Sequence, residues 1–171
     1  DVLLQENFIS CCDHVEDIEI YGSVISATHD VNLKKLLLSL KYLKRFDLNC
    51  TITSSSFLSI IHHTNLQELY ITHLNLNENI IDFLTEGIRY SKLKTLDLSY
   101  NDFNDSSFKL LCDSLTATNI EFLFLCCCHV TTERFSHLIN ILDKSKSTHL
   151  DLFLNKIKNE AITIKKFNSY S

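Results

Sequence analysis

The sequence of 171 residues contains no proline, no methionine and no tryptophan, and it has only two glycines. Loops that cradle nucleotide phosphates need several glycines close together, but Gly22 and Gly87 lie far apart in the sequence. This scarcity excludes a glycine-rich phosphate-binding loop, and the lack of proline excludes a proline-rich linker. Because the chain has no methionine, residue 1 is not an ordinary translation start. We therefore expect a fragment, a processed form or a trimmed form of a longer protein.

The sequence also lacks the run of roughly 18 apolar residues that a membrane-spanning helix requires. No basic segment precedes the first apolar residues, so the sequence shows no signal peptide. Its formal net charge is −5, which does not favour binding to nucleic acid. We therefore expect a partner that is neither nucleic acid nor membrane.

The seven cysteines are odd in number and partly adjacent, which makes a poor disulfide framework. We expect reduced thiols and a cytoplasmic, reducing location. The run Cys126, Cys127, Cys128 and His129 has no second pair at the C-x-x-C spacing of structural zinc sites. No local motif fixes a nucleophile beside a base. The sequence therefore predicts no metal site, no cofactor and no catalytic residues.

The main feature that the sequence does contain is an internal repeat of six segments. The pattern that they share places apolar residues at positions 1, 4, 6 and 11 and a small polar residue at position 9. The starts lie 28, 23, 27, 27 and 27 residues apart, and 22 of the 24 apolar positions are filled. A composition that is 45% hydrophobic would fill about eleven of them by chance. The segments begin at Val15, Leu43, Leu66, Leu93, Ile120 and Ser147.

This pattern resembles the leucine-rich repeat, L-x-x-L-x-L-x-x-(N/C)-x-L, most clearly from Leu93 to Phe103. The period near 27 resembles the ribonuclease-inhibitor-like class, which is also found in the sensing arrays of intracellular immune receptors. The resemblance implies an α/β solenoid shaped as a curved horseshoe, with parallel strands on its concave face and helices on its convex face. We expect one such solenoid over residues 1–171, in which residues 1–14 form an N-terminal helix or half-repeat.

Position 9 is predicted to hold the turn that follows each strand, because a small polar side chain can bond to the backbone groups there. Leu74 departs from this pattern and follows the short spacing of 23, so its turn register is open. After each turn the apolar residues recur with a helical period, and a helix is also predicted from Ile157 to Phe167. The predicted turn residues are Ser23, Thr51, Asn101, Cys128 and Asn155.

Positions 3, 5 and 7 of each strand are predicted to point outward from the concave face. Aromatic residues gather on the last two strands, and carboxylates recur at position 5 on the others. Exposed aromatic clusters are typical of protein interfaces. The alternative is that neighbouring repeats absent from this sequence, or packing between adjacent strands, cover these aromatic side chains. The carboxylates have two interpretations: they bind a basic partner surface, or they form a solvated polar face. The predicted partner-binding residues are Glu19, Asp47, Tyr70, Asp97, Tyr100, Phe122, Phe124, Cys126, Asp151 and Phe153.

These features predict a non-enzymatic module that recognises a protein partner through the strand face. It could belong to a larger receptor, an adaptor or an effector. Two alternatives stay open at this stage. One is the substrate-receptor array of a ubiquitin ligase of the F-box type, although residues 1–14 show no adaptor-binding segment. The other is a pathogen effector.

Overall fold

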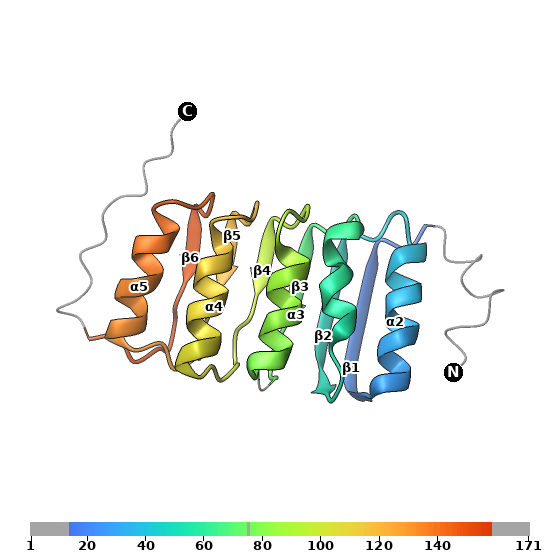
Figure 1. The fold of residues 1–171 in the computed structure, drawn as a ribbon, viewed down its shortest axis with the longest axis horizontal. Helices are drawn as coiled ribbons and strands as arrows, with labels where there is room; N and C mark the ends of the chain where they lie inside the picture. Colours follow the sequence, from blue (N-terminus) through green and yellow to red (C-terminus); the bar gives the residue numbers. More distant parts are fainter. Residues whose placement is uncertain (1–13, 75, 159–171) are drawn as a thin grey trace.

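The computed structural model describes residues 14–74 and 76–158, and within them strands and helices alternate along a solenoid (Figure 1). The predicted N-terminal half-repeat, apart from His14, and most of the predicted C-terminal helix lie outside the described residues. The elements are β1 (Asp17–Ile25), α2 (Ala27–Ser39), β2 (Arg45–Ile52), the 3₁₀ helix η2 (Ser56–His63), β3 (Glu68–Ile71), α3 (Glu78–Ile88), β4 (Thr95–Asp97), α4 (Asp105–Leu115), β5 (Phe122–Phe124), α5 (Thr132–Leu142) and β6 (His149–Asp151).

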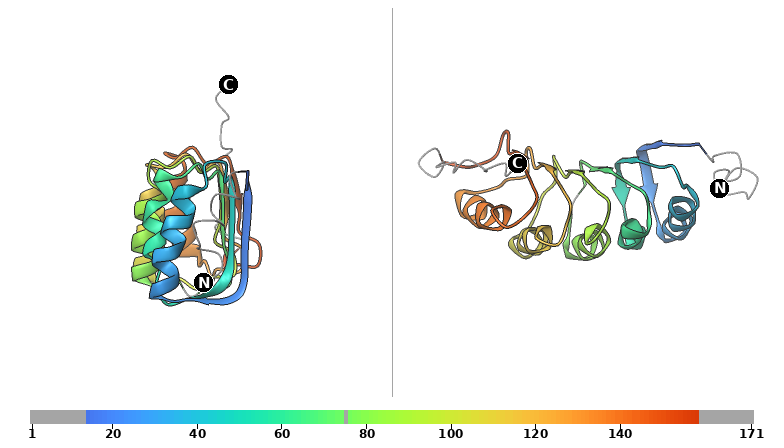
Figure 2. Two further views of the ribbon diagram at one scale, coloured as in Figure 1. Left: turned by 90° about the vertical axis from the view of Figure 1, so that its right-hand side faces the viewer. Right: turned by 90° about the horizontal axis from the view of Figure 1, so that it is seen from above.

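The strands form one parallel six-stranded sheet in the order β1-β2-β3-β4-β5-β6. Seen from above, the strands line the inner side of a gentle arc and the helices line its outer side (Figure 2). The predicted α/β solenoid is therefore confirmed. Position 3 aligns across all six repeats, including the one after the short spacing. Its residues are Asp17, Arg45, Glu68, Thr95, Phe122 and His149.

The core lies between the sheet and the helices. The residues at positions 4 and 6 of β2 to β5 are fully buried, because a neighbouring repeat covers each side. Their counterparts on β1 and β6 are half-buried and pack against the same core from its two ends. Stacking of neighbours therefore buries the apolar face that a single repeat leaves open.

Repeat length explains why the second helix differs from the others. The second repeat has 23 residues where its neighbours have 27 or 28, so about one helical turn is missing. In its place the chain forms η2, a 3₁₀ helix, whose tighter winding suits a short connection. Asn77, Asn104 and Thr131 cap α3, α4 and α5, and each side chain accepts the N–H of the residue three positions later.

Asn101 is buried and bonds to two neighbouring turns. Its Oδ1 accepts the Leu74 N–H at 2.7 Å, and its Nδ2 donates to the Ile71 and Leu98 carbonyls at 2.6 and 2.8 Å. Leu74 is itself buried, so the neighbouring asparagine satisfies the backbone of a turn whose own position 9 is apolar.

Asn155 occupies the same place two repeats later. It accepts the N–H groups of Cys128 and Val130 at 3.0 and 2.8 Å and donates to the Leu125 carbonyl at 2.6 Å. The Cys128 thiol, also buried, donates to the carbonyls of Leu98 and Cys126 at 3.2 and 3.3 Å. The Cys128 thiol thus donates to backbone carbonyls, as the amide nitrogen of Asn155 does, but it accepts no backbone N–H in the way that the Asn155 amide oxygen does.

The structure corrects the turns predicted at Thr51 and Ser23. β2 continues through Thr51, which is exposed and pairs with Val24, and the buried residue is instead Cys50. β1 also extends past Ser23, but its register with β2 shifts between Tyr21 and Val24, and the side chain of Ser23 lies outside the described part of the chain. These two strands are longer because their backbones stay paired to Ile25 and Ile52. A strand that keeps alternating places the residue after buried Cys50 on the opposite face.

Position 8 takes a left-handed backbone in five of the six repeats. The exception is Cys50 in the second repeat, where the strand does not turn. A positive φ costs a residue other than glycine, asparagine or aspartate roughly 1 to 2 kcal/mol. The residues and their φ values are Gly22 (63°), His73 (59°), Tyr100 (60°), Cys127 (54°) and Leu154 (56°).

Replacement of Leu154 with asparagine is expected to raise the free energy of unfolding by about 1 kcal/mol, because asparagine tolerates this backbone. Leu154 is 65% exposed, so the change sacrifices little packing. Urea unfolding measures the gain. The control is Phe153→Asn, since Phe153 is equally exposed but is not among the positive-φ residues. An equal effect of both changes would contradict the explanation from backbone strain.

Candidate protein-binding surface

Six side chains form the aromatic patch, which lies at the β6 end of the strand face and its rim: Tyr100, Phe122, Phe124, His149, Phe153 and Leu154. Phe122 and Phe124 are half-buried at positions 3 and 5 of β5. The Phe122 ring stacks on the His149 ring of β6, with centroids 4.5 Å apart. Phe153, Leu154 and Tyr100 are 67%, 65% and 52% exposed. The array therefore presents an apolar surface without an intramolecular cover among the described residues.

Tyr100 lies on the rim of this face, where its ring stacks on that of His73 with centroids 4.6 Å apart. Cys126 is half-buried beside the patch, and its N–H donates to Ser99 Oγ at 3.1 Å. Asp97 and Asp151 each accept the N–H of the residue two positions later, at 2.8 and 2.9 Å. The predicted carboxylates on β4 and β6 thus also order the ends of their own strands.

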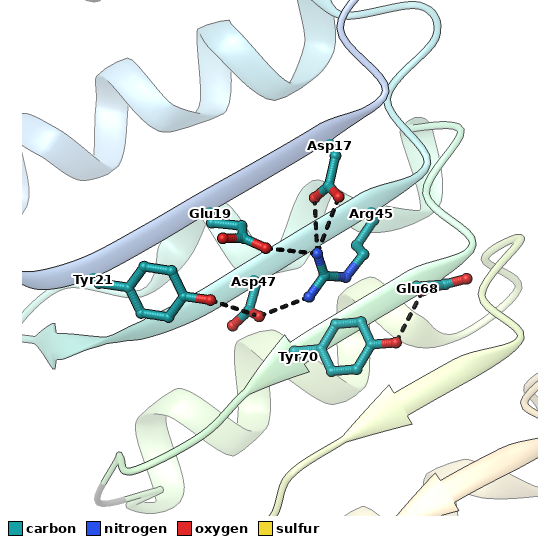
Figure 3. A network of polar contacts seen from close by, with 7 residues as sticks. All are labelled: Asp17, Glu19, Tyr21, Arg45, Asp47, Glu68 and Tyr70. Atoms are coloured by element: carbon teal, nitrogen blue, oxygen red, sulfur yellow. Dashed lines mark hydrogen bonds and ion pairs between the residues drawn. The ribbon is translucent and has the colours of Figure 1, made fainter.

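The other half of the strand face carries a polar network centred on Arg45 (Figure 3). The Arg45 guanidinium pairs with Asp17, Glu19 and Asp47 at 3.0, 2.7 and 3.0 Å. It also lies over the Tyr70 ring, 4.7 Å from the centroid. The predicted residues Glu19, Asp47 and Tyr70 therefore converge on one guanidinium.

The same network sets the ionisation of its members. Burial raises the pKa of Asp47 despite its bonds to the Tyr21 hydroxyl at 3.2 Å and to Arg45. Burial and the bond to Glu68 raise the pKa of Tyr70, whose hydroxyl donates to Glu68 at 2.9 Å. The hydrogen bonds from Arg45 to Glu19 and Asp17 raise its pKa, so the guanidinium stays charged.

Arg45 and His149 were missed as site residues, although the repeat contained a signal for both. Each occupies position 3, which lies in register across the whole sheet. Arg45 is the cation that follows Asp17 at this position, and His149 is the ring that follows Phe122. A comparison of position 3 between adjacent repeats would have paired them.

The cysteines of the described region are free thiols, and burial suppresses the ionisation of most of them. It raises the pKa of Cys112 and Cys128 to about 12, and it raises the pKa of Cys50 and Cys126 by a smaller amount. A thiol that stays protonated is a poor nucleophile and a poor metal ligand. Within residues 14–74 and 76–158, no three His, Cys, Asp or Glu side chains form a group that could hold a metal ion.

Within residues 14–74 and 76–158, no helix has both the length and the apolar character needed to cross a membrane.

Comparison with known proteins shows three related sequences. The chain is 28% identical to mouse NACHT, LRR and PYD domains-containing protein 4C over 96% of the length of this chain. It is 29% identical to mouse NACHT, LRR and PYD domains-containing protein 4E over 75% of that length. It is 31% identical to human NACHT, LRR and PYD domains-containing protein 13 over 57% of its length. The chain spans only 10 to 17% of the length of these curated relatives.

No family model matches the sequence. Among solved structures, an internalin of Listeria monocytogenes is similar over 91% of this chain and 46% of its own, with a TM-score of 0.48 and 16% identity. The six aligned strand–helix repeats and the asparagine turns agree with the relatives that carry LRR in their names. The chain thus folds as a leucine-rich-repeat solenoid whose repeat period resembles that of the ribonuclease-inhibitor-like class.

Proposed function

We propose that this array is a non-enzymatic recognition module that binds a protein partner through the aromatic patch on its strand face. The observation that carries the proposal is that the last two repeats expose Phe153 and Leu154 after β6 and stack the Phe122 ring of β5 on the His149 ring of β6. Aromatic side chains supply a large share of the binding energy at protein interfaces. A soluble fold gains no stability from leaving such side chains open to water.

The solenoid also suits binding because its surface is formed in advance. Phe122 and Phe124 lie on a hydrogen-bonded sheet, and the residues beneath them are fully buried. A partner that docks there orders few additional groups, so less of the contact energy is lost to entropy. The raised pKa values of Cys50, Cys112, Cys126 and Cys128 also make these four thiols poor nucleophiles.

The relatives suggest a setting for this activity. Their names combine LRR with NACHT and PYD domains. We propose that the array serves as the recognition part of an intracellular receptor of that kind, which would place it in innate immunity. Free thiols at Cys50, Cys112, Cys126, Cys127 and Cys128 support a reducing, cytoplasmic location.

The double substitution Phe122→Asp and Phe124→Asp tests the proposal. It is expected to weaken partner binding by about ten-fold or more, because two buried charges replace two interface rings. Affinity capture with the full-length parent protein, followed by mass spectrometry, identifies partners. Binding assays with each purified partner then measure the loss. Circular dichroism and urea unfolding show whether the variant keeps its fold.

The matched control is Val31→Asp with Leu38→Asp on α2, where both side chains are exposed on the helical side, at 54% and 52%. This variant removes apolar surface from the opposite face and is expected to bind as the wild type does. Phe153→Asp, at a side chain that makes little core contact, serves as a second test if the double variant unfolds. If all variants bind the same partners equally, the patch is not the binding surface.

A further inference from the structure

A second surface of the array lies on the edge where each helix returns to a strand, at the top of Figure 1. This basic edge consists of residues 14–16, 40–44, 64–67, 89–94, 116–121 and 143–148. It contains seven cations and three carboxylates, and all seven cations are exposed. The cations are Lys41, Lys44, Arg89, Lys92, Lys94, Lys144 and Lys146, and the carboxylates are Glu16, Glu121 and Asp143.

The strand face next to this edge has the opposite charge. Its outward positions carry six carboxylates and a single cation, Arg45. The net charge of −5 therefore hides two surfaces of opposite sign. The six carboxylates belong to Asp17, Glu19, Asp47, Glu68, Asp97 and Asp151.

Only two of the seven cations form ion pairs within the described part of the chain. Lys44 pairs with Glu16 at 2.8 Å, and Lys94 pairs with Glu121. Lys92 and Lys146 each donate at 2.5 Å to a neutral amide, of Asn65 and Asn119 respectively. The remaining three have no carboxylate within 4.0 Å among these residues. Most of the positive charge on the edge is therefore available to a partner.

Helix dipoles explain only part of this charge. Lys41, Arg89 and Lys144 lie at or just beyond the C-terminal ends of helices, where a cation is favourable. Lys92, Lys94 and Lys146 lie closer to the strands that follow. The dipoles do not account for these three lysines.

Two exposed tyrosines lie among the cations. Tyr42 is 52% exposed and Tyr90 is 78% exposed. Tyr90 also has a φ of 60°, a conformation that glycine or asparagine adopts at lower cost. Neither core packing nor backbone preference therefore explains a tyrosine at this position. Tyrosine is enriched in binding interfaces, where its ring packs and its hydroxyl bonds.

We propose that the basic edge binds an acidic segment of a protein partner, separately from the aromatic patch. The unpaired lysines and Arg89 would face its carboxylates, and Tyr42 and Tyr90 would contact its apolar side chains. A short acidic segment can follow the edge without meeting the strand face. A membrane surface or a long nucleic acid extends over the neighbouring carboxylates, which repel it.

The test measures the fluorescence anisotropy of a labelled peptide of about ten residues in which glutamate and leucine alternate. An extended peptide of this length is comparable to the width of a six-stranded sheet. The wild-type array is expected to bind it, and 0.5 M salt is expected to weaken the binding. Lys92→Glu with Lys146→Glu is expected to reduce affinity about ten-fold or more, since each position then carries a negative charge that repels the acidic peptide. Tyr90→Asn, which suits the backbone, is expected to reduce affinity about three-fold.

The control variant is Lys35→Glu with Lys109→Glu on α2 and α4, which makes the same change in charge at exposed positions on the helical side. It is expected to bind the peptide as the wild type does. The Phe153→Asp variant, at the end of β6 that lies away from the edge, is also expected to retain peptide binding, which separates this surface from the aromatic patch.

Several results would overturn the proposal. One is an equal loss of affinity in the edge and control variants, and another is the absence of peptide binding by the wild type. The same assay is run with phosphatidylcholine vesicles containing phosphatidylserine and with single-stranded oligo-thymidine. Tighter binding to either of these than to the peptide would identify a membrane or a nucleic acid as the partner instead.

Discussion

Gly87→Ala is expected to lower the free energy of unfolding by about 3 kcal/mol, the upper end of what overpacking costs in a well-packed interior. A Cβ atom at position 87 would lie 1.8 Å from the Leu58 carbonyl oxygen and 2.8 Å from its carbonyl carbon. Both contacts are with backbone atoms, so no side-chain rotation relieves them. α3 and η2 must separate, and the gain in helix propensity from alanine, about 1 kcal/mol, does not offset that.

Gly22→Ala provides the matched control because it isolates the other role of glycine. No atom lies within 4 Å of a Cβ at position 22, but its φ is 63°. The expected cost is about 1 kcal/mol, from backbone strain alone. Urea unfolding of both variants gives the comparison, provided that their m-values match that of the wild type. A Gly87→Ala variant as stable as the wild type would contradict the close approach of α3 to η2.

The strand register could be predicted from the sequence because it depends on a local period. Positions 4 and 6 are apolar in every repeat, and a one-residue slip would turn these residues out of the core. The outward positions of the half-buried aromatic side chains of β5 followed from the same alternation. The spacing of 23 also preserved the register at Leu69 and Ile71, because the missing residues were taken from the helix rather than the strand.

Features that join neighbouring repeats were harder to predict. Asn101 satisfies the turn of the repeat before it, so its role depends on Leu74, 27 residues away. The turn predicted at Thr51 was wrong because β1 and β2 stay paired beyond the point where later strands end. The basic edge was hidden by the net charge, since composition does not show how charges are distributed over a fold.

Asp30→Asn is expected to lower the free energy of unfolding by about 3 kcal/mol, because it breaks a buried set of hydrogen bonds to a charged group. Asp30 lies on α2 and is 3% exposed. Its Oδ1 accepts the Phe57 N–H at 2.6 Å, and its Oδ2 accepts the Ser56 N–H at 3.2 Å. The hydroxyls of Ser54 and Ser56 each donate to Oδ2 at 2.7 Å.

This carboxylate therefore caps η2 from the neighbouring repeat. The first N–H groups of a helix have no partner within it, and a negative charge there is favourable. The side chain of Ser55, which precedes η2, makes no capping bond. Asparagine at position 30 offers one acceptor oxygen in place of two and directs an amide donor toward groups that already donate.

The effect of Asp30→Asn is also expected to depend on pH, in a direction set by the carboxylate. Burial favours the protonated form, but the bonds from Ser56, Ser54 and the Phe57 N–H outweigh it and lower the pKa of Asp30. A lowered pKa stabilises the fold fully above the unfolded value of about 3.9, and the stabilisation is lost as the pH falls through the folded value. The stability difference between wild type and Asp30→Asn should therefore shrink as the pH falls below about 4.

Urea unfolding at a series of pH values measures this difference, with Asp82→Asn as the control on the exposed surface of α3. The control is expected to change stability by less than about 0.5 kcal/mol at every pH. A difference for Asp30→Asn that stays constant through the acid range would mean that charge contributes nothing to the cap. Because η2 also contacts α3 at Gly87, loss of the cap is expected to loosen the array at the same junction that Gly87→Ala disrupts.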